Sequence, residues 1–132
     1  MFDTVILIDD DPISILVGET MFRKTSFCST VKSIDNAEEA LKFLDERYRG
    51  GEGLPDLIFL DVRMPVMDGW GFLKEYSVME SLPERTPHVI VLSAAFDEED
   101  LQKAGEYDLV METLVKPLNQ ELLQRLLANI RE

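Results

Sequence analysis

The feature that most constrains the fold is a repeating order of a short apolar segment, a turn and an amphipathic helical segment. Apolar or β-branched runs bounded by turn residues are typical of strands, and they occur at 5–8, 30–34, 57–60, 89–92 and 113–115. The runs at 57–60 and 89–92 are apolar on both faces, as in strands buried on both sides. Strands that alternate with helices in this way predict an α/β fold with a five-stranded parallel sheet flanked by helices on both faces.

Helix starts are marked by residues whose side chains can cap them. Pro12 suits the first position of a helix, and later caps are expected at Asn36, Asp68, Asp97 and Asn119. The strand at 30–34 is the more polar one, so we expect it at an edge of the sheet. Loops are expected at 49–55 and 81–87.

Length, charge and cysteine count limit the classes of protein to which this chain can belong and the partners that it can bind. The 132 residues suit a single domain, and their formal net charge of −13 disfavours nucleic acid and anionic membrane surfaces as partners. No apolar run reaches the roughly 18 residues that span a bilayer. Cys28 is the single cysteine, which excludes an intrachain disulfide and suits the cytoplasm. A divalent cation or a basic partner surface would match the charge better.

Chemically capable residues follow the predicted strands directly. In a parallel sheet the carboxyl ends of the strands lie along one edge, where ligands bind. The residues at these ends are Asp9, Asp10, Asp11, Asp61, Ser93 and Lys116. Carboxylates bind hard divalent cations and can attack phosphorus, while a hydroxyl and a lysine can bind the oxygens of a transferred phosphoryl group.

Electrostatics favour a cation at this edge. Two carboxylates about 6 Å apart repel each other by roughly 2 to 3 kcal/mol at an effective dielectric constant of about 20. Lys116 offsets only part of the repulsion among several acids. We therefore expect Mg²⁺, or Mn²⁺, to be bound there.

Four segments carry a family resemblance: Asp9-Asp10 after the first strand, LDVRMPVMDG at 60–69, VLSA at 91–94 and VKP at 115–117. With these segments in this order, the chain resembles the receiver domain of bacterial two-component response regulators. The resemblance implies a flavodoxin-like doubly wound (βα)5 fold with strand order 2-1-3-4-5. Because the residues after Lys116 suffice for only one helix, we expect a single receiver domain over residues 1–132 without an effector domain, as a monomer or weak homodimer in the cytoplasm.

The resemblance assigns phosphorelay chemistry to the edge. It implies that Asp61 accepts a phosphoryl group from a histidine kinase or a histidine phosphotransfer protein. Ser93 and Lys116 would contact the phosphoryl oxygens, with Ser93 moving on activation. The downstream partner is an unknown protein. The chain would be an acceptor with possible self-dephosphorylation, and not a turnover enzyme.

The resemblance also implies a metal site. Asp10 and Asp61 would bind Mg²⁺ together with the backbone carbonyl of Arg63, and Asp9 would help through water. The side chain of Arg63 is expected to face solvent. Trp70 is expected to serve helix packing.

One position departs from the family pattern. Many receivers carry an aromatic residue three positions before the lysine, where this chain has Thr113. The usual aromatic switch is therefore not expected. We expect the response to run through Ser93 and the backbone at 94–100, with Phe96 repositioning.

Two alternative functions remain open. ILIDDDP also fits the nucleophile motif of haloacid-dehalogenase-like phosphatases, with Asp9 as nucleophile and Asp11 as acid. Against that class, the fourth strand ends in SAAF without an acidic pair, and the chain has no room for a cap domain. The other alternative is a receiver-like binding module that is not phosphorylated, which only Thr113 favours.

Overall fold

The fold is built around one parallel sheet. The computed structural model describes residues 1–79 and 87–130, so the loop predicted at 81–87 lies, except for Pro87, outside the described residues. The strands are β1 (Phe2–Ile8), β2 (Cys28–Ile34), β3 (Leu57–Asp61), β4 (His88–Ser93) and β5 (Val110–Val115). All neighbouring strands pair in parallel in the order β2-β1-β3-β4-β5. The predicted fold class and strand order are confirmed, and the polar strand β2 lies at an edge.

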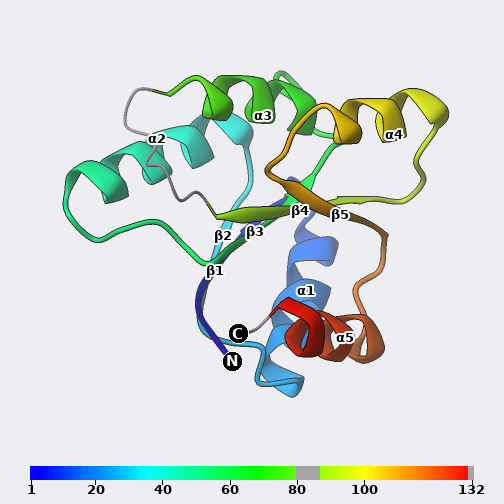
Figure 1. Cartoon of the computed structure of the whole chain (residues 1–132). Coiled ribbons are helices and arrows are strands. Elements are labelled where there is room, and N and C mark those ends of the chain that lie inside the picture. The colour runs from blue at the N-terminus through cyan, green and yellow to red at the C-terminus, as the bar shows by residue number, and fades with distance from the viewer. Residues whose placement is uncertain (80–86, 131–132) are drawn as a thin grey trace.

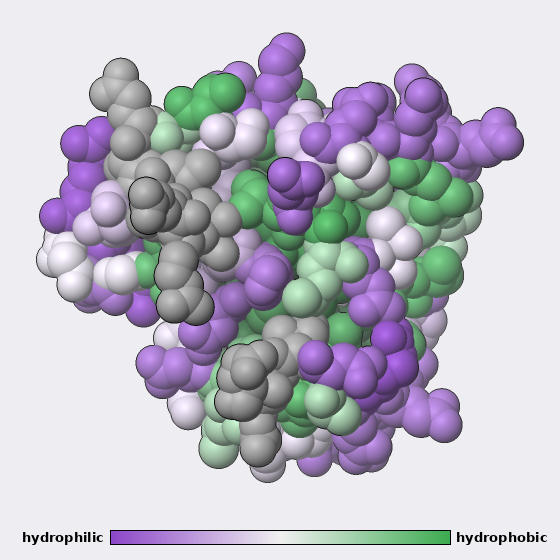
Figure 2. All heavy atoms as spheres, in the orientation of Figure 1, coloured by the Kyte–Doolittle hydropathy of each residue, from purple (hydrophilic) through white to green (hydrophobic). Residues whose placement is uncertain are grey.

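Helices cover both faces of the sheet. They are α1 (Pro12–Lys24), α2 (Ala37–Arg49), α3 (Gly69–Ser77), α4 (Glu98–Gly105) and α5 (Gln120–Ile130). α1 and α5 pack on one face, and α2, α3 and α4 on the other (Figure 1). Figure 2 shows hydrophobic residues in the middle of this view, where the sheet lies between the two helical layers. Hydrophilic residues cover the outer turns of α4. No described helix is long and apolar enough to cross a membrane.

The central strands bury side chains on both faces, as their sequences predict. Ile58 and Leu60 face the α2–α3 layer, whereas Leu57 and Phe59 face α1 and α5, because successive strand residues point to opposite sides. Phe59 belongs to an aromatic cluster with Phe2, Phe22 and Phe27, whose neighbouring ring centroids lie 5.1–5.8 Å apart. These two cores hold the carboxyl ends of the strands in place.

The caps confirm the predicted helix starts, while strand bounds differ. The side chains of the predicted caps each accept a backbone N–H of the first turn, at Asn36, Asp68, Asp97 and Asn119, and Asp11 does the same before α1. β5 begins at Val110, three residues earlier than predicted. The prediction was wrong because the charged Glu112 interrupts the apolar residues of this segment, while backbone pairing with β4 continues across it to Val110.

A close approach of backbones places α3 beside the end of β3. A Cβ atom on Gly69 would lie 2.7 Å from Val62 Cα and 2.8 Å from the carbonyl oxygen of Asp61. Only glycine therefore lets α3 begin directly against these residues. In the segment between β3 and α3, Val66 adopts a φ of 69°, which is unusual for a β-branched residue. Its side chain is 97% exposed.

Candidate functional site

The acidic residues that follow β1 and end β3 meet at one edge of the sheet. Asp9, Asp10 and Asp61 each offer a carboxylate oxygen, and these oxygens lie within 4.8 Å of one another. Asp9 and Asp61 are buried, whereas Asp10 is exposed. Adjacent parallel strands β1 and β3 bring them together, although the sequence separates them by about fifty residues.

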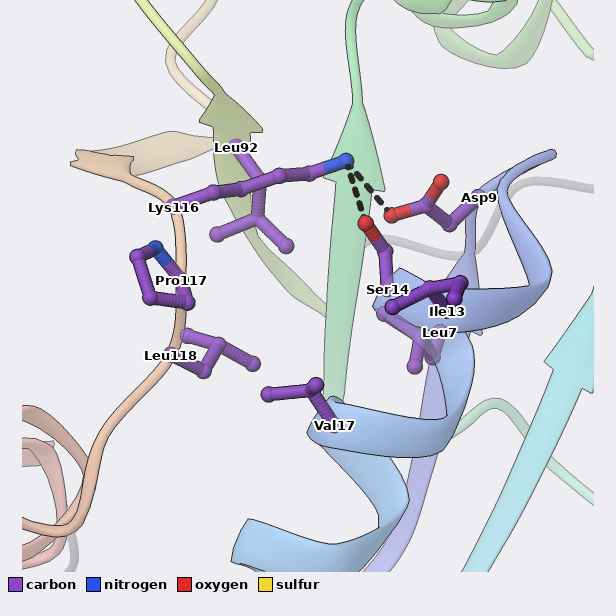
Figure 3. A pocket seen from close by; sticks show the side chains of 9 residues that line it. All are labelled: Leu7, Asp9, Ile13, Ser14, Val17, Leu92, Lys116, Pro117 and Leu118. Atoms are coloured by element: carbon purple, nitrogen blue, oxygen red, sulfur yellow. Dashed lines mark hydrogen bonds and ion pairs between the residues drawn. The ribbon is translucent and has the colours of Figure 1, made fainter.

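Lys116 reaches this cluster from the segment after β5. Its Nζ lies 2.8 Å from Asp9 Oδ2 and 3.3 Å from Asp61 Oδ2. It also donates to Ser14 Oγ at 3.3 Å, and Figure 3 shows the lysine side chain extended toward Asp9 and Ser14. Burial alone would lower the pKa of Lys116, but the two carboxylates outweigh burial and raise it. Lys116 is therefore a fixed positive charge at Asp61.

Asp61 is held in an unusual electrostatic state. Burial of its carboxyl group is the largest cause that raises its pKa, to about 6, and the charge of Asp9 adds to this. The backbone N–H of Arg63, which donates to Asp61 Oδ1 at 3.0 Å, and the charge of Lys116 act in the opposite direction. The ionised form of Asp61 is therefore electrostatically unfavourable at neutral pH unless a further cation is present.

The donor set fits Mg²⁺. It consists of carboxylate oxygens, the ligands that this hard cation prefers. One ammonium group, that of Lys116, pairs with Asp9 and Asp61 in a cluster of three acids. Asp9 Oδ2 is buried and, apart from its ion pair with Lys116, receives no hydrogen bond from the described residues. The cluster therefore has unused capacity for a divalent cation.

We expect Mg²⁺ to stabilise the chain in a pH-dependent way. At tenfold its Kd, a ligand of the native state adds about 1.4 kcal/mol, or about 5 °C in Tm for a domain of this size. Because the pKa of Asp61 is raised to about 6, the stability that its protonated form contributes is lost as pH rises through 6. Mg²⁺ binds the ionised form, so its stabilisation should grow from pH 5 to pH 7.5. Melting curves with millimolar Mg²⁺ measure this.

The exposed Asp10 offers a control for that measurement. Asp10→Asn should raise the stability of the metal-free protein and weaken the response to Mg²⁺, because it removes one repelling charge and one ligand. An unchanged wild-type melting curve with Mg²⁺ at pH 7.5 would exclude the metal site.

Ser93 lies at the same edge, but its hydroxyl is engaged elsewhere. The side chain is buried at the end of β4. Its Oγ donates to the carbonyl oxygen of Ala95 at 2.7 Å and accepts the Ala95 N–H at 3.2 Å. The hydroxyl is therefore part of the turn between β4 and α4 in this state.

The Arg63 side chain is exposed, as predicted, but its guanidinium makes contacts that the sequence did not predict. Its guanidinium pairs with Asp100 in the first turn of α4 and donates to the carbonyl oxygen of Ala95 at 3.3 Å. Trp70, predicted only as a packing residue, also donates from Nε1 to Asp100 Oδ1 at 3.1 Å. Asp100 and Ser14 were missed, because in the sequence they look like surface residues in the first turns of helices.

A small cavity adjoins Lys116. It has a volume of about 130 Å³ and lies between α1 and the segment after β5. Its lining combines apolar side chains with the inner end of the site, at Leu7, Asp9, Ile13, Ser14, Val17, Leu92, Lys116, Pro117 and Leu118 (Figure 3). Ile13 is 68% exposed at its rim. Apolar surface therefore borders the charged edge directly.

Comparisons with known proteins agree on one family. The response regulator receiver domain family matches residues 5–128. A two-component response regulator from Cytophaga hutchinsonii superposes with a TM-score of 0.87 at 30% identity, over 96% of this chain and 95% of that one. The receiver domain of the histidine kinase CKI1 from Arabidopsis thaliana, in complex with Mg²⁺, gives 0.80 at 27% identity, over 94% and 91%.

Curated relatives agree. The probable methanogenesis regulatory protein FilR2 of Methanothrix harundinacea is 29% identical over 97% of this chain and 81% of its own length. The chain spans about half the length of several other curated relatives. With the acidic cluster fitting a phosphoacceptor site, the chain belongs to the response regulator receiver domain family and acts in phosphorelay signalling.

Proposed function

We propose that Asp61 accepts a phosphoryl group from a phosphohistidine of a histidine kinase or a histidine phosphotransfer protein. Receiver domains interact with such proteins and are signalling modules. The observation that carries the assignment is the position of Lys116, whose Nζ lies against both Asp9 and Asp61. A fixed ammonium group at a buried carboxylate is the arrangement that phosphoryl transfer needs.

The transfer moves one phosphoryl group between two protein side chains. A carboxylate oxygen of Asp61 attacks phosphorus, an O–P bond forms, and the N–P bond to the donor imidazole breaks. Lys116 neutralises charge on the phosphoryl oxygens, and the Arg63 N–H holds the other carboxylate oxygen. Receiver domains bind Mg²⁺ at their acidic pocket. Here Asp10, Asp61 and the Arg63 carbonyl would hold it, with Asp9 nearby, and it would supply further positive charge.

The site argues against the phosphatase alternative. Asp11, which would be the general acid, accepts the N–H of Ile13 at 3.1 Å and the hydroxyl of Ser14 at 3.0 Å, so it is occupied as the cap of α1. Asp9, which would be the nucleophile, is 1% exposed and paired with Lys116. We therefore assign the chain as an acceptor that does not turn over a substrate.

Incubation with acetyl phosphate and Mg²⁺ tests the proposal. We expect one added phosphoryl group by intact mass, located on Asp61 by peptide mapping after reductive trapping of the acyl phosphate. Continuous release of phosphate that depends on Asp9 would instead show a phosphatase. No added mass with either acetyl phosphate or a phosphorylated histidine partner would leave a binding module that is not phosphorylated.

The partner must cover the rim of the site to deliver its phosphohistidine. Exposed Ile13 lies there, next to the cavity that Pro117 also lines (Figure 3). Ile13→Asp should slow transfer from the protein partner about tenfold or more, because a charge in a small apolar contact opposes docking. Labelling by acetyl phosphate should be unchanged, since the acids are untouched. Quench-flow transfer and acetyl phosphate labelling, measured in parallel, separate docking from chemistry; equal loss in both would contradict this role.

A further inference from the structure

A buried carboxylate ties α4 to the loop that follows the phosphoacceptor strand. Asp100 is 4% exposed, lies in the first turn of α4 and forms a capping box with Asp97. It accepts hydrogen bonds from the Arg63 guanidinium, from Trp70 Nε1 and from the Asp97 N–H. We call Arg63, Trp70, Ala95 and Asp100 the α4 clasp. Its contacts join the β3–α3 loop, α3 and α4.

The clasp touches the phosphoacceptor site at two points. Arg63 donates its backbone N–H to Asp61 Oδ1 at 3.0 Å, while its guanidinium reaches Asp100 and the carbonyl oxygen of Ala95. That carbonyl oxygen also accepts the Ser93 hydroxyl at 2.7 Å. One oxygen, that of Ala95, is therefore held by two residues of the site.

These contacts fix the start of α4 firmly. A buried charge is tolerated only when it is paired and hydrogen-bonded, and bidentate arginine pairs are among the stronger interactions. The Arg63 guanidinium holds the pKa of Asp100 well below its usual range, so the carboxylate is ionised at neutral pH. Moving α4 away from the β3–α3 loop would leave Asp100 without its cation.

Resting on Asp61 as the phosphoacceptor, we propose that the α4 clasp opposes activation and that phosphorylation loosens it. A phosphoryl group on Asp61 offers oxygens to the Ser93 hydroxyl, which then leaves the carbonyl oxygen of Ala95. The turn at 94–97 and the first turn of α4 lose one of their two anchors, and the Arg63–Asp100 contact becomes the remaining restraint. Thr113 carries no ring to transmit the change through β5, so the response concentrates at α4.

A restraint on the resting state lowers the apparent affinity for any ligand of the active state, because only a fraction of molecules can bind it. Loss of the clasp should therefore strengthen binding of a phosphoryl mimic. Beryllofluoride, which occupies the CKI1 receiver together with Mg²⁺, is the probe. Variants that lack the clasp would reach the active state more readily than the wild type, although Asp61, Ser93 and Lys116 are unchanged in them.

The wild type supplies the first test. Trp70 is the only tryptophan and contacts Asp100 directly, so its emission reports on the clasp. With Mg²⁺ already saturating, added beryllofluoride should change Trp70 emission and speed hydrogen exchange most within residues 94–104. Ser93→Ala should abolish both changes while beryllofluoride still binds. Binding to the wild type with no change at Trp70 or at 94–104 would overturn the proposal.

Two variants break the clasp from opposite sides. Arg63→Met keeps the backbone groups at that position, and Asp100→Asn keeps the positive charge of Arg63. Both should bind beryllofluoride about three- to tenfold more tightly than the wild type, as expected when the competent fraction rises. Arg49→Met is the matched control, since it removes an exposed arginine pair on α2, and it should bind like the wild type.

The direction in which each of the two variants changes beryllofluoride affinity distinguishes the clasp proposal from a direct action of Arg63 on the phosphoryl group. If Arg63→Met weakens binding while Asp100→Asn leaves it unchanged, Arg63 acts as a charge at the site and the clasp proposal is wrong. If acetyl phosphate does not label Asp61 in the wild type, the proposed function itself fails. Labelling of Asp61 without any response at the clasp rejects only the clasp.

Discussion

Asp61→Asn is expected to abolish labelling by acetyl phosphate and Mg²⁺ and, at the same time, to stabilise the metal-free protein. The amide is no nucleophile toward phosphorus, so the added mass should disappear. Stability should rise because burial and Asp9 raise the pKa of Asp61 from 3.8 to about 6. At about 1.4 kcal/mol for each pKa unit, removing this strained charge should add about 1 to 3 kcal/mol at pH 7.

The sign of the stability effect depends on pH. The contribution of a carboxyl with a raised pKa is fully present below its unfolded pKa and is lost as pH rises through about 6. The gain from Asp61→Asn should therefore be largest at pH 7 and shrink toward pH 4, as urea unfolding at both pH values can measure. Asp56→Asn is the control, because that exposed carboxylate accepts the Asp3 N–H away from the site. Labelling that persists in Asp61→Asn would rule out Asp61 as the acceptor.

Lys116→Met should slow labelling of Asp61 by about a hundredfold or more, the usual loss when a preorganised charge at the reacting group is removed. Methionine fills a similar volume but leaves Asp9 and Asp61 facing each other without an ammonium group. The metal-free protein should also become less stable, because the buried Asp9 loses its cation.

The kinetics of acetyl phosphate labelling and the melting curve report the two effects separately. Lys74→Met is a matched control, since Lys74 is exposed on α3 and should leave both unchanged. If Asp61 is labelled at the wild-type rate in the Lys116→Met variant while the variant is less stable, Lys116 serves only to neutralise the charge of Asp9 and Asp61. That outcome would remove the central support for the proposed transfer.

The sequence predicted the architecture and the meeting of the acids because both follow from one rule. Parallel strands end at a common edge, so residues at or directly after the ends of the strands, such as Asp9, Asp61 and Lys116, must gather there. Apolar runs and capping residues located the strands and helices without knowledge of contacts. The edge strand β5 was less well predicted, since Glu112 interrupts its apolar residues and backbone pairing with β4 extends the strand across it to Val110.

Contacts between side chains on different elements could not be predicted in this way. Arg63 and Asp100 are 37 positions apart, and Ser14 and Lys116 are 102 apart. In the sequence Asp100 is one of several acids in DEED, and only its burial against Trp70 distinguishes it. The rotamer of Ser93 likewise depends on the local turn, which presents the carbonyl oxygen of Ala95 to its hydroxyl.

The common direction of the strands also determines how this chain can be handled. Asp61 lies at the carboxyl edge of the sheet, whereas β1 starts at the opposite edge, and α5 returns toward that opposite edge after β5 (Figure 1). A biotin group or a fluorescent protein attached at the start of β1 or at the end of α5 would therefore lie across the body of the molecule from the acids. The chain can be immobilised on a sensor surface from either of these places, with its acidic edge left open to partner proteins and small phosphodonors in solution.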